Sequence, residues 1–233
     1  MVPPRARRHA PRLGAALMAL FAALVTTLSV ALVLPGAVRA APAGRTLNLV
    51  AFGDSLSAGY RLPASAAFPA VLERALTAKG HAVSVANAGV SGDTATGGLD
   101  RVDWSVPDGT DGVILELGAN DMLRGTDPAV TRKALEAIVT RLKARGIPVL
   151  LAGMHASRNL GPDYTARFDA IFPDLAKAHD LVLYPFFLNG IVGDRTFNLE
   201  DGLHPNTKGV ETIVAGILPT VETFIDRIRS RVP

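Results

Sequence analysis

The sequence predicts an α/β fold, a three-layer α/β/α sandwich in which helices cover both faces of a five-stranded parallel sheet. Short apolar runs rich in Val, Ile and Leu alternate with longer segments of helical periodicity. Continuous apolar runs of this kind are typical of parallel strands that are buried on both faces. With 233 residues, of which 48% are hydrophobic and 19% charged, the chain is long enough for one domain with a substantial core.

Five apolar runs are candidates for the strands. Each has four to six residues, the usual length of a strand in a globular protein. Since long segments separate the runs, helical crossovers can connect them as parallel neighbours. In chain order the expected strands are Leu47–Phe52, Ala82–Ala86, Gly112–Leu117, Pro148–Ala152 and Leu181–Tyr184.

Five segments with helical periodicity lie between and after these runs. The third has the clearest ends, because Asp127 can cap free amides, Pro128 suits the first helical position and Gly146 suits the exit. In chain order the expected helices are Phe68–Lys79, Thr94–Val102, Pro128–Arg145, Tyr164–Ala178 and Thr207–Arg229.

Residues 1–40 have the order of features found in a secretory signal peptide. Four arginines between residues 5 and 12 are followed by an uncharged stretch of 22 residues, 13–34, and then by small residues. This order predicts export to the periplasm or beyond, with cleavage after Ala40 or Ala43. Because 22 residues can also span a bilayer, an uncleaved membrane anchor is the alternative.

The remainder, residues 41–233, is expected to form a single domain. Residues 1–40 hold five arginines and no acid, whereas the remainder holds 19 basic and 21 acidic residues. The net charge of +3 therefore arises from the leader, and no nucleic acid partner is expected. The chain has no cysteine, which excludes disulfides and a thiol nucleophile, and its five histidines lack the paired spacing of a metal site.

Polar, glycine-rich segments follow three of the expected strands, and a fourth precedes the last helix. Because ligands of open parallel sheets bind beyond the carboxyl ends of the strands, these segments are the candidates for a site. They are residues 53–57 (GDSLS), 89–94 (GVSGDT), 118–121 (GAND) and 201–205 (DGLHP).

A serine hydrolase site can be assembled from these four segments. Ser55 is the candidate nucleophile, His204 the base that takes its proton, and Asp201 the acceptor that orients the base. Backbone amides of Ser55 and Gly92 and the side-chain amide of Asn120 are candidate donors to an oxyanion. Taken singly, each segment is also a common turn or helix cap, so their co-occurrence at one sheet edge carries the hypothesis.

The same four segments resemble blocks I, II, III and V of the SGNH (GDSL) hydrolases, in the same order. Further residues, among them Gly98-Leu99 and 122–125 (MLRG), resemble the bacterial subfamily of thioesterase I, lysophospholipase and arylesterase. The resemblance extends over residues 45–225. One departure is Ala119, where many members have glycine, and its methyl group lies close to the expected oxyanion hole.

The resemblance implies a flavodoxin-like sandwich and an esterase that hydrolyses carboxylic esters or acyl thioesters without a metal or organic cofactor. It implies the roles given above for Ser55, Gly92, Asn120, Asp201 and His204. The expected partners are a small acyl ester or a lipid, with transient contact to a membrane surface. The alternatives are a polysaccharide deacetylase with the same triad and a catalytically idle binding module.

Several other side chains are candidates for the substrate side of the cleft. The segment 154–164, with His155, is expected to border the cleft, and His155 is more simply a surface residue than a second base. Arg124 can contact an acidic headgroup or pair with a local carboxylate. Three aromatic residues are expected either to line an acyl site or to pack in the core: Trp104, Phe186 and Phe187.

Overall fold

The computed structural model describes Met1 and residues 45–231, so the predicted leader and its cleavage positions lie outside the described residues. Among the described residues, no helix combines the length and the apolar character needed to span a bilayer. The described residues of the folded unit begin at Arg45.

All five predicted strands are present and form one parallel sheet in the order β2-β1-β3-β4-β5. The order reverses between β1 and β3, which is where an open sheet of this kind leaves a crevice at its carboxyl edge. The strands are β1 Leu47–Gly53, β2 Val83–Gly89, β3 Gly112–Glu116, β4 Val149–Ala152 and β5 Val182–Tyr184.

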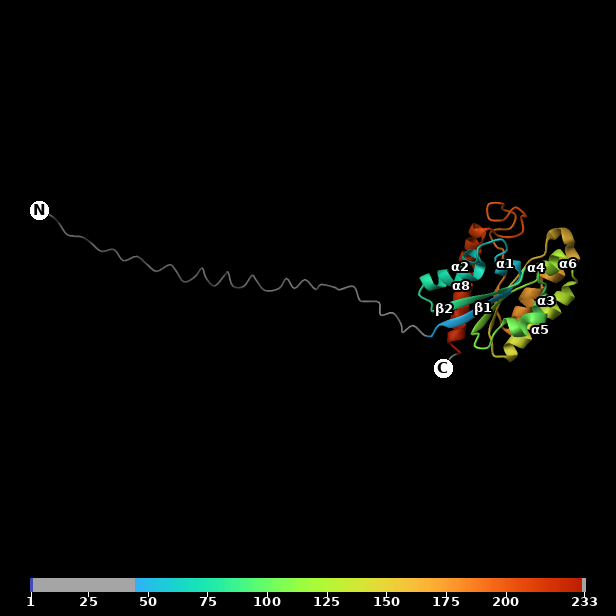
Figure 1. Ribbon diagram of the computed structural model, residues 1–233, viewed down its shortest axis with the longest axis horizontal. Helices are drawn as coiled ribbons and strands as arrows, with labels where there is room; N and C mark the ends of the chain where they lie inside the picture. The colour runs from blue at the N-terminus through green and yellow to red at the C-terminus, as the bar shows by residue number, and fades with distance from the viewer. Residues whose placement is uncertain (2–44, 232–233) are drawn as a thin grey trace. The chain divides into compact units, whose positions relative to one another are not determined.

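Helices pack on both faces of the sheet, which confirms the predicted α/β class (Figure 1). On one face α2 (Phe68–Ala78) packs against α8 (Thr207–Arg229). On the other face α3 (Ala95–Ser105) packs against α5 (Pro128–Ala144), which also contacts α7 (Ile171–His179).

Shorter helical elements lie in the connections. Four of them fall in segments that the sequence pattern left as loops. They are α1 Ser55–Ala58, α4 Ala119–Leu123, and the 3₁₀ turns η1 Ala64–Ala66 and η2 Arg158–Leu160.

The predicted helix Tyr164–Ala178 is wrong as a single element, because the structure divides it into α6 (Pro162–Asp169) and α7. Pro173 explains the division. Proline has no N–H to donate to the carbonyl four residues earlier, here that of Asp169, and it is tolerated only near the start of a helix. Proline therefore fits the first turn of α7 but not the middle of a continuous helix.

The first three strands of the sheet end at the same level. Gly53 is paired with Gly89 of β2 and with Glu116 of β3, and each of the three is the last residue of its strand. Residues that follow these strands therefore leave the sheet at one edge. Ser55, Gly92 and Asn120 come two, three and four residues after the respective strand ends.

Candidate active site

Ser55 is the first residue of α1 and sits at the turn that follows β1. The Asp54 side chain caps this short helix by accepting a hydrogen bond from Leu56 N at 2.9 Å. Gly59, with φ at 79°, ends the helix in the left-handed conformation that suits glycine. The turn holds Ser55 at the strand end with only 8% of its surface exposed.

His204 belongs to the turn that precedes α8. Asp201 organises this turn, because its Oδ1 accepts the backbone N–H groups of Leu203 and His204 at 2.9 and 3.0 Å. Its Oδ2 lies 2.8 Å from His204 Nδ1. Hydrogen bonds from the His204 backbone N–H, the Leu203 N–H and the imidazole lower the pKa of the Asp201 carboxyl to about 2.

The three side chains form one hydrogen-bonded series. His204 Nε2 lies 2.9 Å from Ser55 Oγ, while the opposite ring nitrogen faces Asp201. A carboxylate only accepts, so Nδ1 carries the ring proton and Nε2 is free to accept the serine proton. The ring of Tyr60 packs against the imidazole of His204, with 4.4 Å between the two ring centroids. This packing limits how far the imidazole can tilt.

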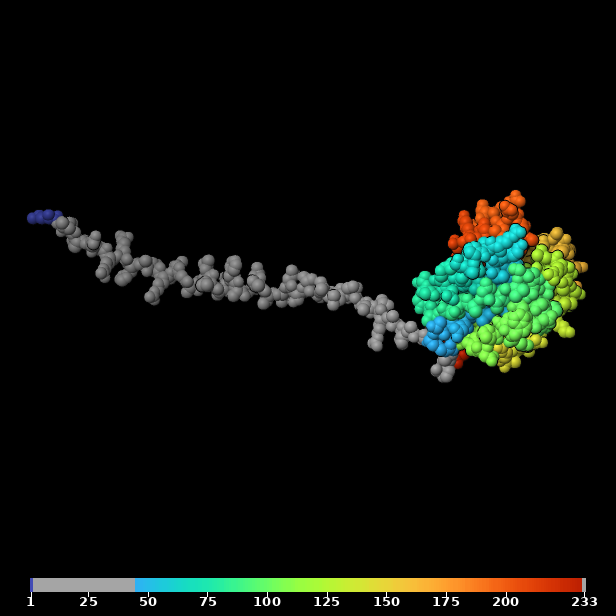
Figure 2. Space-filling model, in the orientation of Figure 1, coloured from blue at the N-terminus to red at the C-terminus, as the bar shows by residue number. Residues whose placement is uncertain are grey.

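Early and late segments of the folded unit come together at this site (Figure 2). The orange segment that precedes α8 lies at the same end of the folded unit as the cyan segment that follows β1. The contact between Ser55 and His204 joins residues 149 positions apart in the sequence.

The expected oxyanion donors lie at the same sheet edge but differ in their surroundings. Asn120, in α4, lines the same cavity as Ser55. Its Nδ2 donates to Asp54 Oδ2 and to the Asp93 carbonyl, both at 3.0 Å. Gly92 lies outside the cavity lining, with φ at 87° and its carbonyl accepting from Arg124 Nη2 at 2.8 Å.

A cavity of about 670 Å³ opens beside Ser55 and His204. This volume is within the range of small-molecule sites. Its wall is largely apolar, with a polar side formed by residues 157–159. The apolar lining includes Met122, Leu123, Met154, Phe186, Leu188, Ile191, Val192 and Leu203.

Two carboxyl groups are buried beneath the nucleophile turn. Asp54 is fully buried, and burial is the largest cause that raises its pKa to about 6. Glu116, at the end of β3, accepts from Ser57 Oγ at 2.8 Å and from Asp54 N at 3.4 Å. Burial, reinforced by the nearby Asp54 carboxyl, raises the pKa of Glu116 well above its ordinary value, so the neutral acid is favoured.

Sequence reasoning missed Glu116, although a signal was present. A glutamate inside the otherwise apolar run of the third expected strand has to be buried, and a buried carboxyl needs partners. It also missed Arg101, which is buried in α3, and the packing of Tyr60 on the imidazole. These contacts join distant segments, so spacing along the chain does not reveal them.

The remaining substrate-side candidates from the sequence lie in the cavity, in the core or at the surface. Residues 154–159 line the cavity, as expected for the substrate-side segment, and His155 is among them. Phe186 lines the cavity and Phe187 is fully buried in the core. Trp104 does neither, because 75% of its surface is exposed on the polar face of α3, and both expectations for it are wrong.

A hydroxyl, an imidazole and a carboxylate in this series, at the carboxyl edge of a parallel sheet, are characteristic of serine hydrolases. Residues 51–211 match the GDSL-like lipase/acylhydrolase family. The chain belongs to this family, and it is an ester-bond hydrolase of the SGNH type.

Curated relatives have similar sequences over most of their length. An arylesterase of Vibrio mimicus is 39% identical over 159 residues, which are 68% of this chain and 80% of the relative. The thioesterase 1/protease 1/lysophospholipase L1 of Escherichia coli (strain K12) is 41% identical over 160 residues, 68% of this chain and 76% of the relative.

Solved structures share the fold. The crystal structure of TesA matches with a TM-score of 0.72 and 34% identity, over 76% of this chain and 98% of TesA. AlinE4, described as an SGNH-hydrolase family esterase, matches with a TM-score of 0.66 and 42% identity, over 78% of this chain and 97% of AlinE4.

Proposed function

We propose that the chain hydrolyses acyl esters, acyl thioesters or lysophospholipids through an acyl-enzyme, with Ser55 as nucleophile, His204 as base and Asp201 as the residue that orients the base. The observation that carries this proposal is the series from Ser55 Oγ through His204 to Asp201, with contacts of 2.9 and 2.8 Å. Both contacts are within hydrogen-bond length in the free enzyme, where such contacts are often longer.

The proposed reaction has two halves. His204 Nε2 takes the proton of Ser55 as the hydroxyl oxygen attacks the acyl carbon, and then returns that proton to the leaving group. Water, deprotonated by the same nitrogen, then attacks the acyl carbon, and that proton returns to Ser55 Oγ as its bond to the acyl group breaks. Asp201 stabilises the imidazolium in both halves, because its low pKa keeps it ionised at all but very acidic pH.

The oxyanion would be held by the N–H groups of Ser55 and Gly92 and by Asn120 Nδ2. Among the residues that the structure describes, neither of these two backbone N–H groups donates to another protein group. Asn120 Nδ2 already has two acceptors, so it would share a hydrogen with the oxyanion as charge develops there.

Replacement of Ser55 by alanine tests the proposal. We expect Ser55→Ala to lower kcat for p-nitrophenyl butyrate by about 10⁶-fold while the thermal midpoint stays unchanged. A fluorophosphonate probe should label the native chain and not the variant. Ser84→Ala, an exposed serine on β2, is the matched control. Turnover by Ser55→Ala at the native rate would refute the assignment, and a native chain that the probe does not label would indicate an idle binding module.

The apolar cavity favours longer acyl groups over acetyl. Each methylene that becomes buried contributes about 0.8 kcal/mol, equivalent to about fourfold in kcat/KM. A series of p-nitrophenyl esters from acetate upward should therefore show kcat/KM rising with chain length until the cavity is filled. A maximum at acetate, together with release of acetate from acetylated glycans, would instead favour a polysaccharide deacetylase.

We also infer transient contact with a lipid surface and a location in the periplasm or outside the cell. Three apolar residues that line the cavity, Leu123, Val192 and Leu203, are each more than half exposed, which supports the first inference. The order of features in residues 1–40 supports the second. Sedimentation of the enzyme with phosphatidylcholine vesicles tests the surface contact, which failure to co-sediment would contradict.

A further inference from the structure

Arg101 is a buried arginine in α3 whose guanidinium makes four hydrogen bonds and one aromatic contact. Only 6% of the residue is exposed. Nε binds Asp93 Oδ2 at 2.5 Å, Nη1 binds the Ala88 carbonyl at 2.9 Å and Ser105 Oγ at 3.2 Å, and Nη2 binds the Gly53 carbonyl at 2.9 Å. The guanidinium lies 4.1 Å from the centroid of the Phe52 ring.

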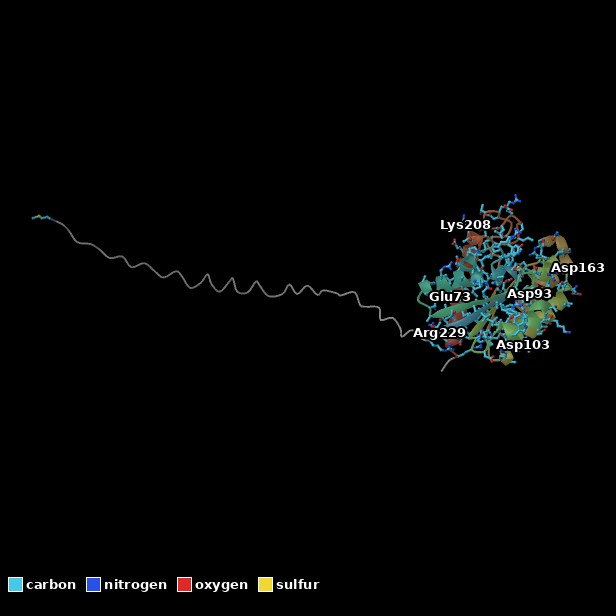
Figure 3. The ribbon with its side chains drawn as sticks, in the orientation of Figure 1. Glu73, Asp93, Asp103, Asp163, Lys208 and Arg229 are labelled. Carbon is cyan, nitrogen blue, oxygen red and sulfur yellow. The ribbon has the colours of Figure 1, made fainter. Side chains whose placement is uncertain are left out.

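The acceptors include the ends of two strands that are far apart in the sequence, β1 and β2. Gly53 ends β1 and precedes Asp54 and Ser55, while Ala88 lies at the end of β2. Asp93 directly follows Gly92 and lies close to α3 (Figure 3). A guanidinium presents several donors in one rigid plane, so it can hold three segments at once, as a lysine ammonium cannot.

Asp93 connects Arg101 to two of the proposed oxyanion donors, Gly92 and Asn120. Its carbonyl accepts from Asn120 Nδ2 at 3.0 Å, and its backbone is continuous with Gly92. Its carboxylate is held by Arg101. On the outer side, Arg124 binds the Gly92 carbonyl. The segment 92–93 is therefore fixed from inside the protein by one arginine and from its surface by another.

We propose that Arg101 is a positioning residue that sets the geometry of the oxyanion donors Gly92 and Asn120 by holding Asp93 against the ends of β1 and β2. The inference rests on the proposed function, because it assumes that these donors stabilise the oxyanion. Arg101 itself does not line the cavity. Its removal leaves the partly buried Asp93 carboxylate without its side-chain donor, so segment 92–93 loses its anchor on the inner side.

The experiment compares Arg101→Gln with Arg141→Gln as the matched control. Arg141 of α5 also binds α3, through the Leu99 carbonyl at 3.3 Å and Asp103 at 3.1 Å, but at its exposed face away from the catalytic edge. We expect Arg101→Gln to lower kcat for p-nitrophenyl butyrate by about 10²-fold with KM changed less than about threefold, since small displacements of catalytic groups act mainly on kcat. Arg141→Gln should leave both constants at native values.

A double-mutant cycle separates positioning from general structural damage. Where Asn120 has been replaced by alanine, one of the two donors that Arg101 helps to place is already gone. Arg101→Gln should then cost less than about tenfold, compared with about 10²-fold in the native background. An equal loss in both backgrounds, or a native kcat for Arg101→Gln, would overturn the inference.

Chemical rescue tests the positioning role directly, because added guanidinium would not restore kcat if Arg101 only stabilised the fold. We expect low millimolar guanidinium to restore part of the kcat of Arg101→Ala, whereas urea at the same concentration does not. Failure of guanidinium to restore any activity to a folded variant would count against the inference. If the arginine variants do not fold, Asp93→Asn keeps a side chain of the same shape, and it should lower kcat with an unchanged KM.

Failure of the positioning role of Arg101 can be told apart from failure of the proposed function. If Ser55→Ala retains hydrolysis, the proposed function is wrong whatever the arginine variants do. If Ser55 is labelled by the fluorophosphonate and Arg101→Gln retains the native kcat, the proposed function stands and the positioning role fails.

Discussion

At the scale of single residues, the least expected groups are the two carboxyls beneath Ser55. Glu116 ties both ends of the nucleophile turn, through Asp54 N and Ser57 Oγ, while its Oε1 has no hydrogen-bond partner among the described residues. An ionised carboxylate in this place would be costly, because it is buried near a second carboxyl. Glu116 therefore acts as a neutral acceptor for these two donors.

This arrangement predicts how stability depends on pH. Unfolded Glu116 releases its proton above its ordinary pKa of 4.5, whereas the folded state retains it because the folded pKa is raised. The folded state then binds more protons, so its stability falls as pH rises from about 4.5 towards the folded pKa. Glu116→Gln removes this dependence. The free energy of unfolding of the variant, relative to that of the native chain, should therefore increase between pH 4.5 and 7.5. Urea titrations at several pH values provide the measurement.

Glu211→Gln, at an exposed position of α8, is the control for this titration. The pH-dependent change in Glu116→Gln should exceed any change in this control over the same range. A constant difference between Glu116→Gln and the native chain across this range would show that Glu116 is ionised in the folded protein.

Asn120 carries the next prediction. If its Nδ2 donates to the oxyanion, Asn120→Ala should lower kcat by about 10²- to 10³-fold with little change in KM. Steady-state kinetics on p-nitrophenyl butyrate provide the measurement. A loss below about threefold would leave Asn120 only the structural role of bridging Asp54 and the Asp93 carbonyl.

The residues with the proposed catalytic roles could be named from the sequence, because each lies in a short polar segment next to a predictable strand or helix. Their neighbours could not. Arg101 reaches Gly53 across 48 positions and Glu116 reaches Ser57 across 59, and no local pattern encodes such contacts. For the same reason, the sequence did not reveal that Asn120 Nδ2 donates to Asp54 and to the Asp93 carbonyl.

At the scale of elements, the close packing of β2 against α1 fixes the nucleophile turn. A Cβ at Gly89 would lie 2.3 Å from Ala58 N and 2.8 Å from the Asp54 carbonyl, which are backbone atoms on either side of Ser55. Only glycine therefore allows α1 to lie against the end of β2.

Gly89→Ala should consequently lower both stability and activity. We expect a loss of about 1–3 kcal/mol in the free energy of unfolding, as for other overpacked sites, and a lower kcat because α1 is displaced. Urea unfolding and steady-state kinetics provide the two measurements. Ser84→Ala, exposed on the same strand, should have neither effect. Native stability in Gly89→Ala would show that α1 can shift at no cost.

Most elements could be predicted because each has its own signal in the sequence. The range of α8 is as predicted, although Pro219 lies inside it and leaves the carbonyl of Ala215 without its helical donor. The extension of β2 to Gly89 was missed, because Asn87 and the glycine are poor strand formers and are held there by pairing with β1. Tertiary pairing decided the end of this strand.

At the scale of the whole molecule, the folded unit begins close to the predicted cleavage positions. The first described side-chain contact is made by Arg45, which pairs with Asp111 at 2.5 Å, and β1 follows from Leu47. Cleavage after Ala40 or Ala43 would remove none of the described contacts.

We therefore expect the exported protein to begin at Ala41 or Gly44, with full activity. N-terminal sequencing or intact mass of the secreted product identifies the cut. A recombinant chain of residues 41–233 should match it in kcat and in thermal midpoint. Recovery of the uncut chain in the membrane fraction would establish the anchored alternative.

The long separation between Ser55 and His204 has a consequence for biosynthesis. If the chain is exported as proposed, it crosses the bilayer unfolded, and the Ser55 hydroxyl then has no base beside it. We expect hydrolytic activity only after the segment that carries His204 has folded beside Ser55. Fragments that end before His204 should lack activity for the same reason.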